Sequence, residues 1–159
     1  MAAVEVPTAG YAIARAPDSL VTVGIGSCLA ICLYSQEHQL GALLHCMLPH
    51  VGQHVTNPCL YVDTALNTVL EKLLSEGIQT ATLTAKLIGG AEMFPDLQPT
   101  GYQGIGRQNI EETTRLLQAI HIPIVASSTG GNRGKSILFD LSTGAVSVST
   151  AFVPATQKI

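Results

Sequence analysis

The sequence predicts an α+β fold in which a mixed β-sheet is flanked by helices. Several short segments rich in apolar and β-branched residues have the pattern of strands, and two segments carry apolar residues at helical spacing. Helices between strands favour crossover connections. The last two predicted strands are separated only by a short turn, residues 141–144, which favours an antiparallel hairpin. Strand directions are therefore expected to be mixed.

The first predicted helix spans Tyr61–Ser75, and Gly77 follows it as a stop signal. The second opens at Asn109, where Glu112 three residues later resembles a capping box, and it ends before Pro123. The predicted strands are Leu20–Ile25, Leu29–Tyr34, Leu40–Leu48, Thr80–Ile88, Ile124–Ser128, Ser136–Asp140 and Ala145–Thr150.

Length and composition bound the class of protein. The 159 residues are expected to form one domain, residues 1–159. Hydrophobic residues make up 47% of the chain, which excludes intrinsic disorder. The longest uninterrupted apolar run is Leu29–Tyr34, far short of the roughly 20 residues that a membrane-spanning helix needs, so no membrane insertion is expected.

Charge and cysteine content narrow the expected environment. The formal net charge is −3 and Lys and Arg form no cluster, so nucleic acid is not an expected partner. The first residues carry neither a basic region nor a long apolar segment, and we therefore expect a cytoplasmic protein with reduced thiols. Its cysteines are Cys28, Cys32, Cys46 and Cys59.

Three loops are dense in glycine: residues 24–27, 89–90 and 130–134. Glycine permits positive φ and close backbone approach, and an ordinary tight turn is the simplest explanation for each loop alone. None has the glycine spacing of a phosphate-binding loop, which excludes that kind of nucleotide site.

Cys28 is a candidate nucleophile because Gly26 and Ser27 precede it in a predicted sharp turn. Such a turn exposes a side chain and leaves backbone N–H groups free to hold the oxyanion that forms at an amide carbonyl. A cysteine between apolar residues is also a common core residue, so Cys28 as a buried strand residue is the competing interpretation.

His45 and Thr22 are candidates to act with that thiol. His45 lies within an apolar predicted strand, where both ring nitrogens need partners, so a satisfied core histidine is the alternative. Cys28 and Cys32 fall on one face of their strand, and either could lie beside His45. Thr22 could orient the imidazole through its hydroxyl, although threonine is also simply common in strands.

Metal binding is the other use for closely spaced cysteines and histidines. The cysteines form no CxxC pair, and His50 and His54 lie in a loop rather than on a helix. The spacing matches no common zinc pattern, and we expect no metal site.

Several separated motifs, in order, resemble the chemoreceptor glutamine deamidase family CheD from about Gly10 to Val148. They are Thr22–Tyr34, Gly41–Pro49, Tyr61–Ala65, Lys86–Phe94, Gly104–Asn109 and Gly130–Gly134. The resemblance implies a β-sandwich-like core similar to the cytotoxic-necrotizing-factor-like cysteine hydrolases. It also implies Cys28 as nucleophile, His45 as catalytic histidine and Thr22 as its supporting residue, with Gly26 and Ser27 binding substrate.

The implied activity is hydrolysis of receptor glutamine side chains to glutamate through a cysteine thioester, with no cofactor. The implied partners are chemoreceptor cytoplasmic helical domains as substrate and a CheC-type phosphatase. A thiolate–imidazolium pair is expected, because a neighbouring histidine lowers the pKa of a thiol. The alternatives are a non-catalytic docking module that regulates such a phosphatase and a hydrolase of small amides.

Overall fold

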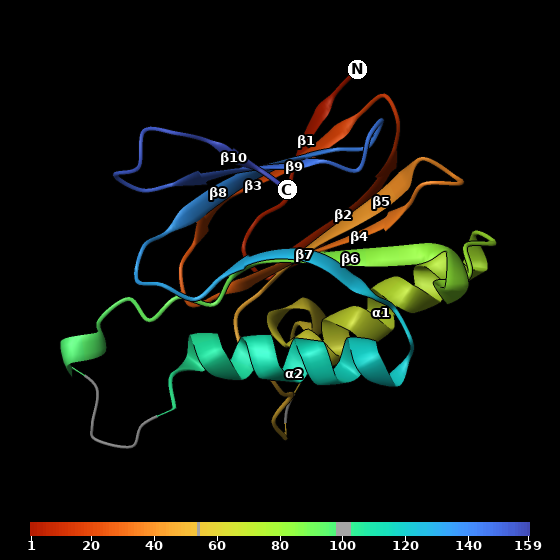
Figure 1. Cartoon of the computed structure of the whole chain (residues 1–159). Helices are drawn as coiled ribbons and strands as arrows, with labels where there is room; N and C mark the ends of the chain where they lie inside the picture. The colour runs from red at the N-terminus through yellow and green to blue at the C-terminus, as the bar shows by residue number, and fades with distance from the viewer. Residues whose placement is uncertain (54, 98–102) are drawn as a thin grey trace.

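The computed structural model describes residues 1–53, 55–97 and 103–159 and stacks three layers. Two β-sheets lie face to face, and two helices cover the outer face of one of them (Figure 1). The predicted α+β class, with a sandwich-like core and flanking helices, is confirmed. Among the described residues, none of the helices has the length and apolar character to cross a membrane.

The first sheet has the strand order β1-β3-β8-β9-β10. β1 runs parallel to β3, and the other neighbours are antiparallel. The hairpin predicted near the end of the chain is confirmed as β8 and β9. The strands are β1 Ala3–Glu5, β3 Ser19–Ile25, β8 Lys135–Asp140, β9 Val146–Thr150 and β10 Gln157–Lys158.

The second sheet has the order β2-β5-β4-β6-β7, with only β6 and β7 parallel. Its strands are β2 Gly10–Arg15, β4 Leu29–Ser35, β5 Leu40–Cys46, β6 Leu83–Gly89 and β7 Ile124–Thr129. Every residue of β4 and β5 is buried, because one face packs on the first sheet and the other on the helices. This two-sided burial explains their continuous apolar sequence.

Helix α1 spans Val62–Ser75, as predicted within one residue, whereas α2 spans Ile105–Ala119 and begins before the predicted Asn109. Asn109 is therefore no cap but a helical residue with a fully buried side chain. Gly106, in the first turn of α2, allows this earlier start to pack on Gly90, because a Cβ at position 106 would come 2.5 Å from the Gly90 oxygen.

Other predicted boundaries also need correction. Residues 80–82 form a 3₁₀ turn rather than the start of β6, and β5 ends at Cys46 rather than Leu48. Strands β1, β2 and β10 were not predicted. β2 has few strongly apolar residues, and its extended form depends on antiparallel pairing with β5, a contact that local sequence does not reveal. Two further short 3₁₀ turns span Pro58–Leu60 and Pro95–Leu97.

Two hydrophobic clusters fill the two interfaces between layers. Leu20 and Phe139 of the first sheet pack with Leu43 of the second, while Leu44 and Cys46 face the helices with Val69 of α1. The alternation of β5 thus directs successive residues into different clusters. It also places His45 toward the first sheet.

We expect Gly89→Ala to destabilise the fold more than Gly24→Ala. Both glycines have positive φ, at +114° and +69°, but a Cβ at position 89 would overlap Ile25 and the Cys28 carbonyl, whereas one at position 24 meets open space. The difference in unfolding free energy should be about 1–3 kcal/mol, measured by denaturant titration. If Gly89→Ala and Gly24→Ala lower the free energy of unfolding equally, then backbone conformation alone selects glycine at position 89.

Candidate active site

The turn formed by Gly26, Ser27 and Cys28 carries the chain from β3 in one sheet to β4 in the other. The Gly26 oxygen accepts a hydrogen bond from Ala91 N at 2.9 Å, and the Cys28 oxygen accepts one from Gly90 N at 2.8 Å. Within the described ranges, the N–H groups of these three turn residues donate to no protein acceptor outside their own residue. The carbonyls are thus held, and the N–H groups remain available to a substrate oxygen.

Cys28 is the only cysteine of the four that is partly exposed, since Cys32, Cys46 and Cys59 are buried. Burial raises the pKa of the Cys28 thiol above its ordinary value, and a hydrogen bond from its own backbone N–H opposes that rise. The thiol is therefore protonated at neutral pH in the free protein. The expectation that a neighbouring histidine lowers this pKa is not met.

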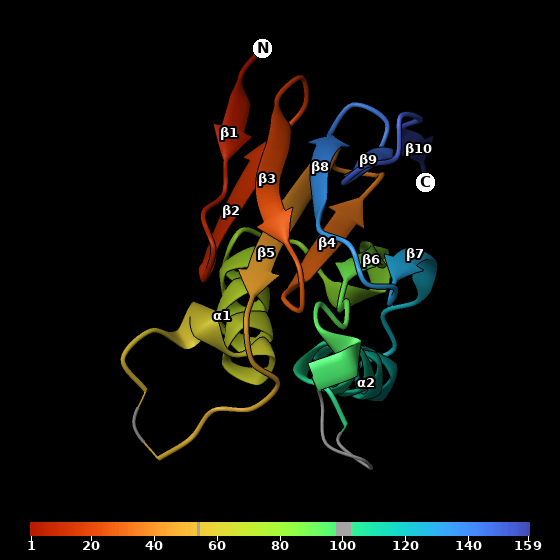
Figure 2. The same ribbon diagram turned by 90° about the vertical axis from the view of Figure 1, so that its left-hand side faces the viewer.

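The structure brings Thr22 and His45 together from strands that face each other across the two sheets (Figure 2). The Thr22 Oγ1 lies 2.7 Å from His45 Nδ1 and also donates to the Val6 carbonyl at 2.7 Å. A hydroxyl has one proton to donate, so Thr22 must accept the proton of Nδ1–H from His45. This assigns the ring proton to Nδ1 and leaves a lone pair on Nε2.

His45 Nε2 is the free end of the hydrogen-bond network that joins His45, Thr22 and Val6. It is buried and makes no hydrogen bond within the described part of the structure. Burial lowers the pKa of the His45 imidazole, so the ring is neutral at pH 7. Both partners of the expected ion pair are therefore uncharged before substrate binds, and Nε2 is set to accept a proton.

The strand register connects His45 with the nucleophile turn. His45 pairs directly with Ala30 of β4, and Cys28 lies two residues before Ala30. Continuing the alternation of β4 by one residue places Cys28 on the same face as Ala30, diagonal to His45. The strand register thus brings the backbone positions of Cys28 and His45 toward the same end of β4 and β5, and Thr22 contacts His45 there.

Cys32 is the other cysteine that the sequence placed near His45. It pairs with Leu43 and lines a separate cavity of about 170 Å³ together with Tyr34 and Lys86. Its thiol is fully buried, and desolvation raises its pKa far above the ordinary range. The geometry therefore distinguishes the two cysteines, which sequence reasoning could not do by alternation alone.

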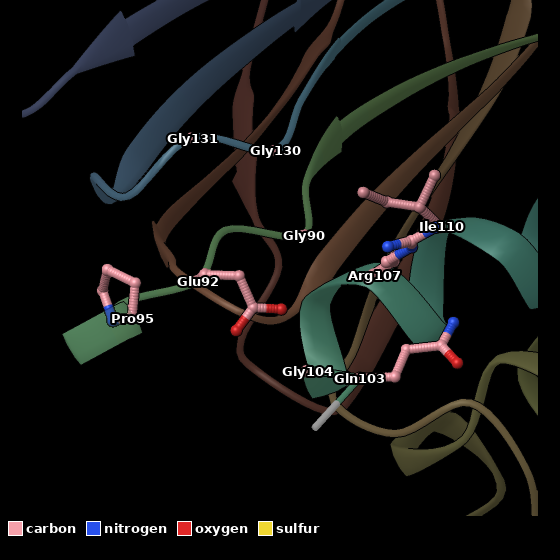
Figure 3. Close-up of a pocket in the computed structure, with 9 residues that line it drawn as sticks. All are labelled: Gly90, Glu92, Pro95, Gln103, Gly104, Arg107, Ile110, Gly130 and Gly131. Atoms are coloured by element: carbon pink, nitrogen blue, oxygen red, sulfur yellow. The ribbon is translucent and has the colours of Figure 1, made fainter. Parts of the chain in front are cut away.

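The glycine-dense loops meet beside the turn. Gly130 N donates to the Gly89 oxygen and Glu92 N to the Gly131 oxygen, each at 2.9 Å. With the start of α2 these loops enclose a cavity of about 400 Å³, into which Glu92 points (Figure 3). The sequence shows each loop but not their convergence, because the contacts that join them are distant in sequence.

We expect the free energy of unfolding to decrease as pH falls below about 6.5. The lowered pKa of His45 means that the unfolded chain binds a proton that the folded chain does not, so acid favours unfolding. His45→Gln should reduce this slope, measured by urea unfolding at about pH 7.5 and about pH 5.5.

The exposed His121, whose φ is +60°, supplies the matched control as His121→Asn, because asparagine tolerates that backbone. This variant should keep the slope of the unsubstituted protein. A slope unchanged by His45→Gln would show that other groups cause the acid sensitivity.

Comparisons with known proteins point to one family. Residues 47–150 match the family model described as "CheD chemotactic sensory transduction". A protein of Desulforamulus reducens is 37% identical over 96% of this chain and 93% of its own length, and its name is "Probable chemoreceptor glutamine deamidase CheD". Proteins of the same name from Clostridium tetani and Pyrococcus abyssi are 38% and 39% identical, over 89% and 90% of this chain and 87% and 88% of theirs. Since the family model matches more than half of the chain and relatives at 37–39% identity match about nine-tenths of it or more, the chain belongs to the CheD family.

Proposed function

We propose that this protein hydrolyses glutamine side chains of chemoreceptors to glutamate, with Cys28 as the nucleophile. The observation that carries the proposal is the chain of hydrogen bonds from His45 Nδ1 through Thr22 to the Val6 carbonyl. It leaves Nε2 as a base, and the pairing of His45 with Ala30 brings that base toward the end of β4 that Cys28 precedes. The names of the relatives supply the substrate class.

In the first half-reaction, His45 Nε2 takes the Cys28 proton as sulfur attacks the amide carbon of the substrate. The developing oxyanion is held by N–H groups of the turn, to which Gly26 and Ser27 contribute backbone donors. His45 then donates the proton to the amide nitrogen, the C–N bond breaks and ammonia leaves. The product is a thioester between Cys28 and the former glutamine side chain.

In the second half-reaction, His45 Nε2 removes a proton from water as its oxygen attacks the thioester carbon. The C–S bond breaks, the proton returns to the Cys28 sulfur, and the side chain leaves as glutamate. The sum is one amide and one water converted to one carboxylic acid and one ammonia, so no cofactor is needed. The new carboxylate adds negative charge to a receptor helix, which alters repulsion between packed helices.

An exposed apolar surface beside the turn suits a helical protein substrate. Met93, Phe94 and Leu97 are 38%, 65% and 79% exposed, and Met93 packs against Gly26. Exposed apolar groups that adjoin a reactive centre are characteristic of protein-binding sites. We assign this surface, Met93–Leu97, to the helical cytoplasmic domain of a chemoreceptor, and a protein that acts on that domain would work in the cytoplasm.

A CheC-type phosphatase is the second proposed partner, and we assign it to the same apolar surface. Shared use of Met93–Leu97 would make phosphatase binding and deamidation mutually exclusive. The non-catalytic docking alternative has no support of its own in the site, because the Thr22–His45 arrangement prepares a base that docking does not require.

Cys28→Ala should abolish deamidation of a receptor cytoplasmic domain, whereas Cys32→Ala should retain it, because only Cys28 reaches the surface. Mass spectrometry of receptor peptides would score amide-to-acid conversion, and circular dichroism would check folding of both variants. Activity that survives Cys28→Ala in a folded protein would refute the proposed nucleophile.

Phe94→Ser should raise KM for the receptor domain and leave kcat nearly unchanged, because Phe94 is assigned to docking rather than to chemistry. Removal of one apolar anchor should raise KM by about 10-fold or more. The exposed Phe152 on another part of the chain provides the control as Phe152→Ser.

A CheC-type phosphatase should inhibit the unsubstituted enzyme competitively with receptor, and inhibition that leaves KM unchanged would contradict the shared surface.

A further inference from the structure

Asn109 of α2 has a fully buried side chain that contacts both halves of the candidate site. Its Nδ2 donates to the Ser27 oxygen at 2.9 Å and to the Met47 oxygen at 3.0 Å. Ser27 directly precedes the nucleophile, and Met47 is the second residue after His45. One side-chain amide therefore joins the cysteine turn to the end of the histidine strand.

The position of these acceptors explains why a side chain is needed there. The ladder between β4 and β5 ends at the pair Leu29 and Cys46. Beyond it the chains diverge, because Met47 N donates to the Leu60 oxygen instead of continuing the ladder. The Ser27 and Met47 carbonyls thus lie past the last strand pair, and the amide bridges the opening.

The bridge requires a group with two hydrogen-bond donors. Two carbonyl oxygens can be joined only by a group that donates twice, which the NH₂ of asparagine does. Its other atom, Oδ1, is buried and has no hydrogen-bond partner among the described residues. A buried polar atom without a partner costs stability, so packing alone does not account for asparagine at this position.

We propose that Asn109 is a positioning residue for glutamine deamidation. By bridging Ser27 and Met47 it sets the separation of the Cys28 thiol and the His45 imidazole, without touching either group. This inference rests on the proposed function, because the separation matters only if thiol and imidazole react together. α2, which lies on the helical face of the second sheet, thereby controls a site at the interface between the sheets (Figure 1).

Asn109→Leu keeps the approximate size of the side chain and removes both donors. It should lower kcat by about 10²-fold, the scale expected when reacting groups are displaced by about 1 Å. KM for the receptor domain should stay nearly constant, because Asn109 is fully buried and the exposed side chains of Met93–Leu97 are unchanged. If Asn109→Leu does not fold, Asn109→Ala, which adds no bulk, is measured in its place.

Asn109→Asp tests the donor requirement. A carboxylate would face two carbonyl oxygens and repel both, so kcat at about pH 8 should fall below that of Asn109→Leu. Protonation restores one O–H donor. The activity relative to the unsubstituted enzyme should therefore rise as pH is lowered from about 8 to about 6. Circular dichroism should show Asn109→Asp folded at both pH values, so that the recovery reports positioning and not refolding.

Two variants on the same helix are the controls. Thr113 is buried one turn later and its Oγ1 has no partner in the described part of the chain, while Leu117 is a buried core residue. Thr113→Val should keep kcat, and Leu117→Ala should lower the melting temperature yet keep kcat below its melting range. If Asn109→Leu and Asn109→Asp behave like Leu117→Ala, the positioning role is wrong.

A second readout separates this inference from the proposed function. Iodoacetamide alkylation of Cys28 needs no receptor, and its rate at neutral pH depends on proton removal by His45. It should slow in His45→Gln and in Asn109→Leu, but not in Leu117→Ala. If alkylation of Cys28 slows in Asn109→Leu but the unsubstituted protein deamidates no receptor, the proposed substrate is wrong. Asn109 is then still supported as a positioning residue. Alkylation unaffected by Asn109→Leu would overturn the inference.

Discussion

The single proton of the Thr22 hydroxyl is the constraint on which the site depends. Because that proton goes to the Val6 carbonyl, the hydroxyl can only accept from His45, and the imidazole is held as the Nδ1–H tautomer. Thr22 belongs to one sheet and His45 to the other, so the same bond that sets the tautomer also joins the layers. The base is prepared by the packing of the two sheets.

A neutral thiol and a neutral imidazole distinguish this site from a preformed ion pair. Burial opposes both charges, raising the pKa of Cys28 and lowering that of His45. His45 Nε2 is then available to accept the Cys28 proton when the thiol reacts.

Backbone contacts hold the nucleophile turn from several sides. Gly90 and Ala91, after β6, bind the Cys28 and Gly26 carbonyls, and Asn109 of α2 binds the Ser27 carbonyl between them. Three consecutive carbonyl groups are thus held, which fixes the backbone of the turn that precedes β4. Close approach at Gly89, where a Cβ would overlap the turn, is what allows this contact.

The sequence by itself determined the elements whose pattern is local: α1, the strands β4 and β5, and the final hairpin. It also singled out Cys28, His45 and Thr22, partly because a polar residue inside an apolar strand stands out. Only the tertiary structure decided which cysteine is accessible, where α2 begins and which ring nitrogen carries the proton. Each of these depends on contacts between residues far apart in the chain, such as Gly106 with Gly90, Thr22 with His45 and Asn109 with Ser27. Periodicity and residue type describe what one segment prefers, whereas tautomer, burial and helix start are set by the neighbours that another segment supplies.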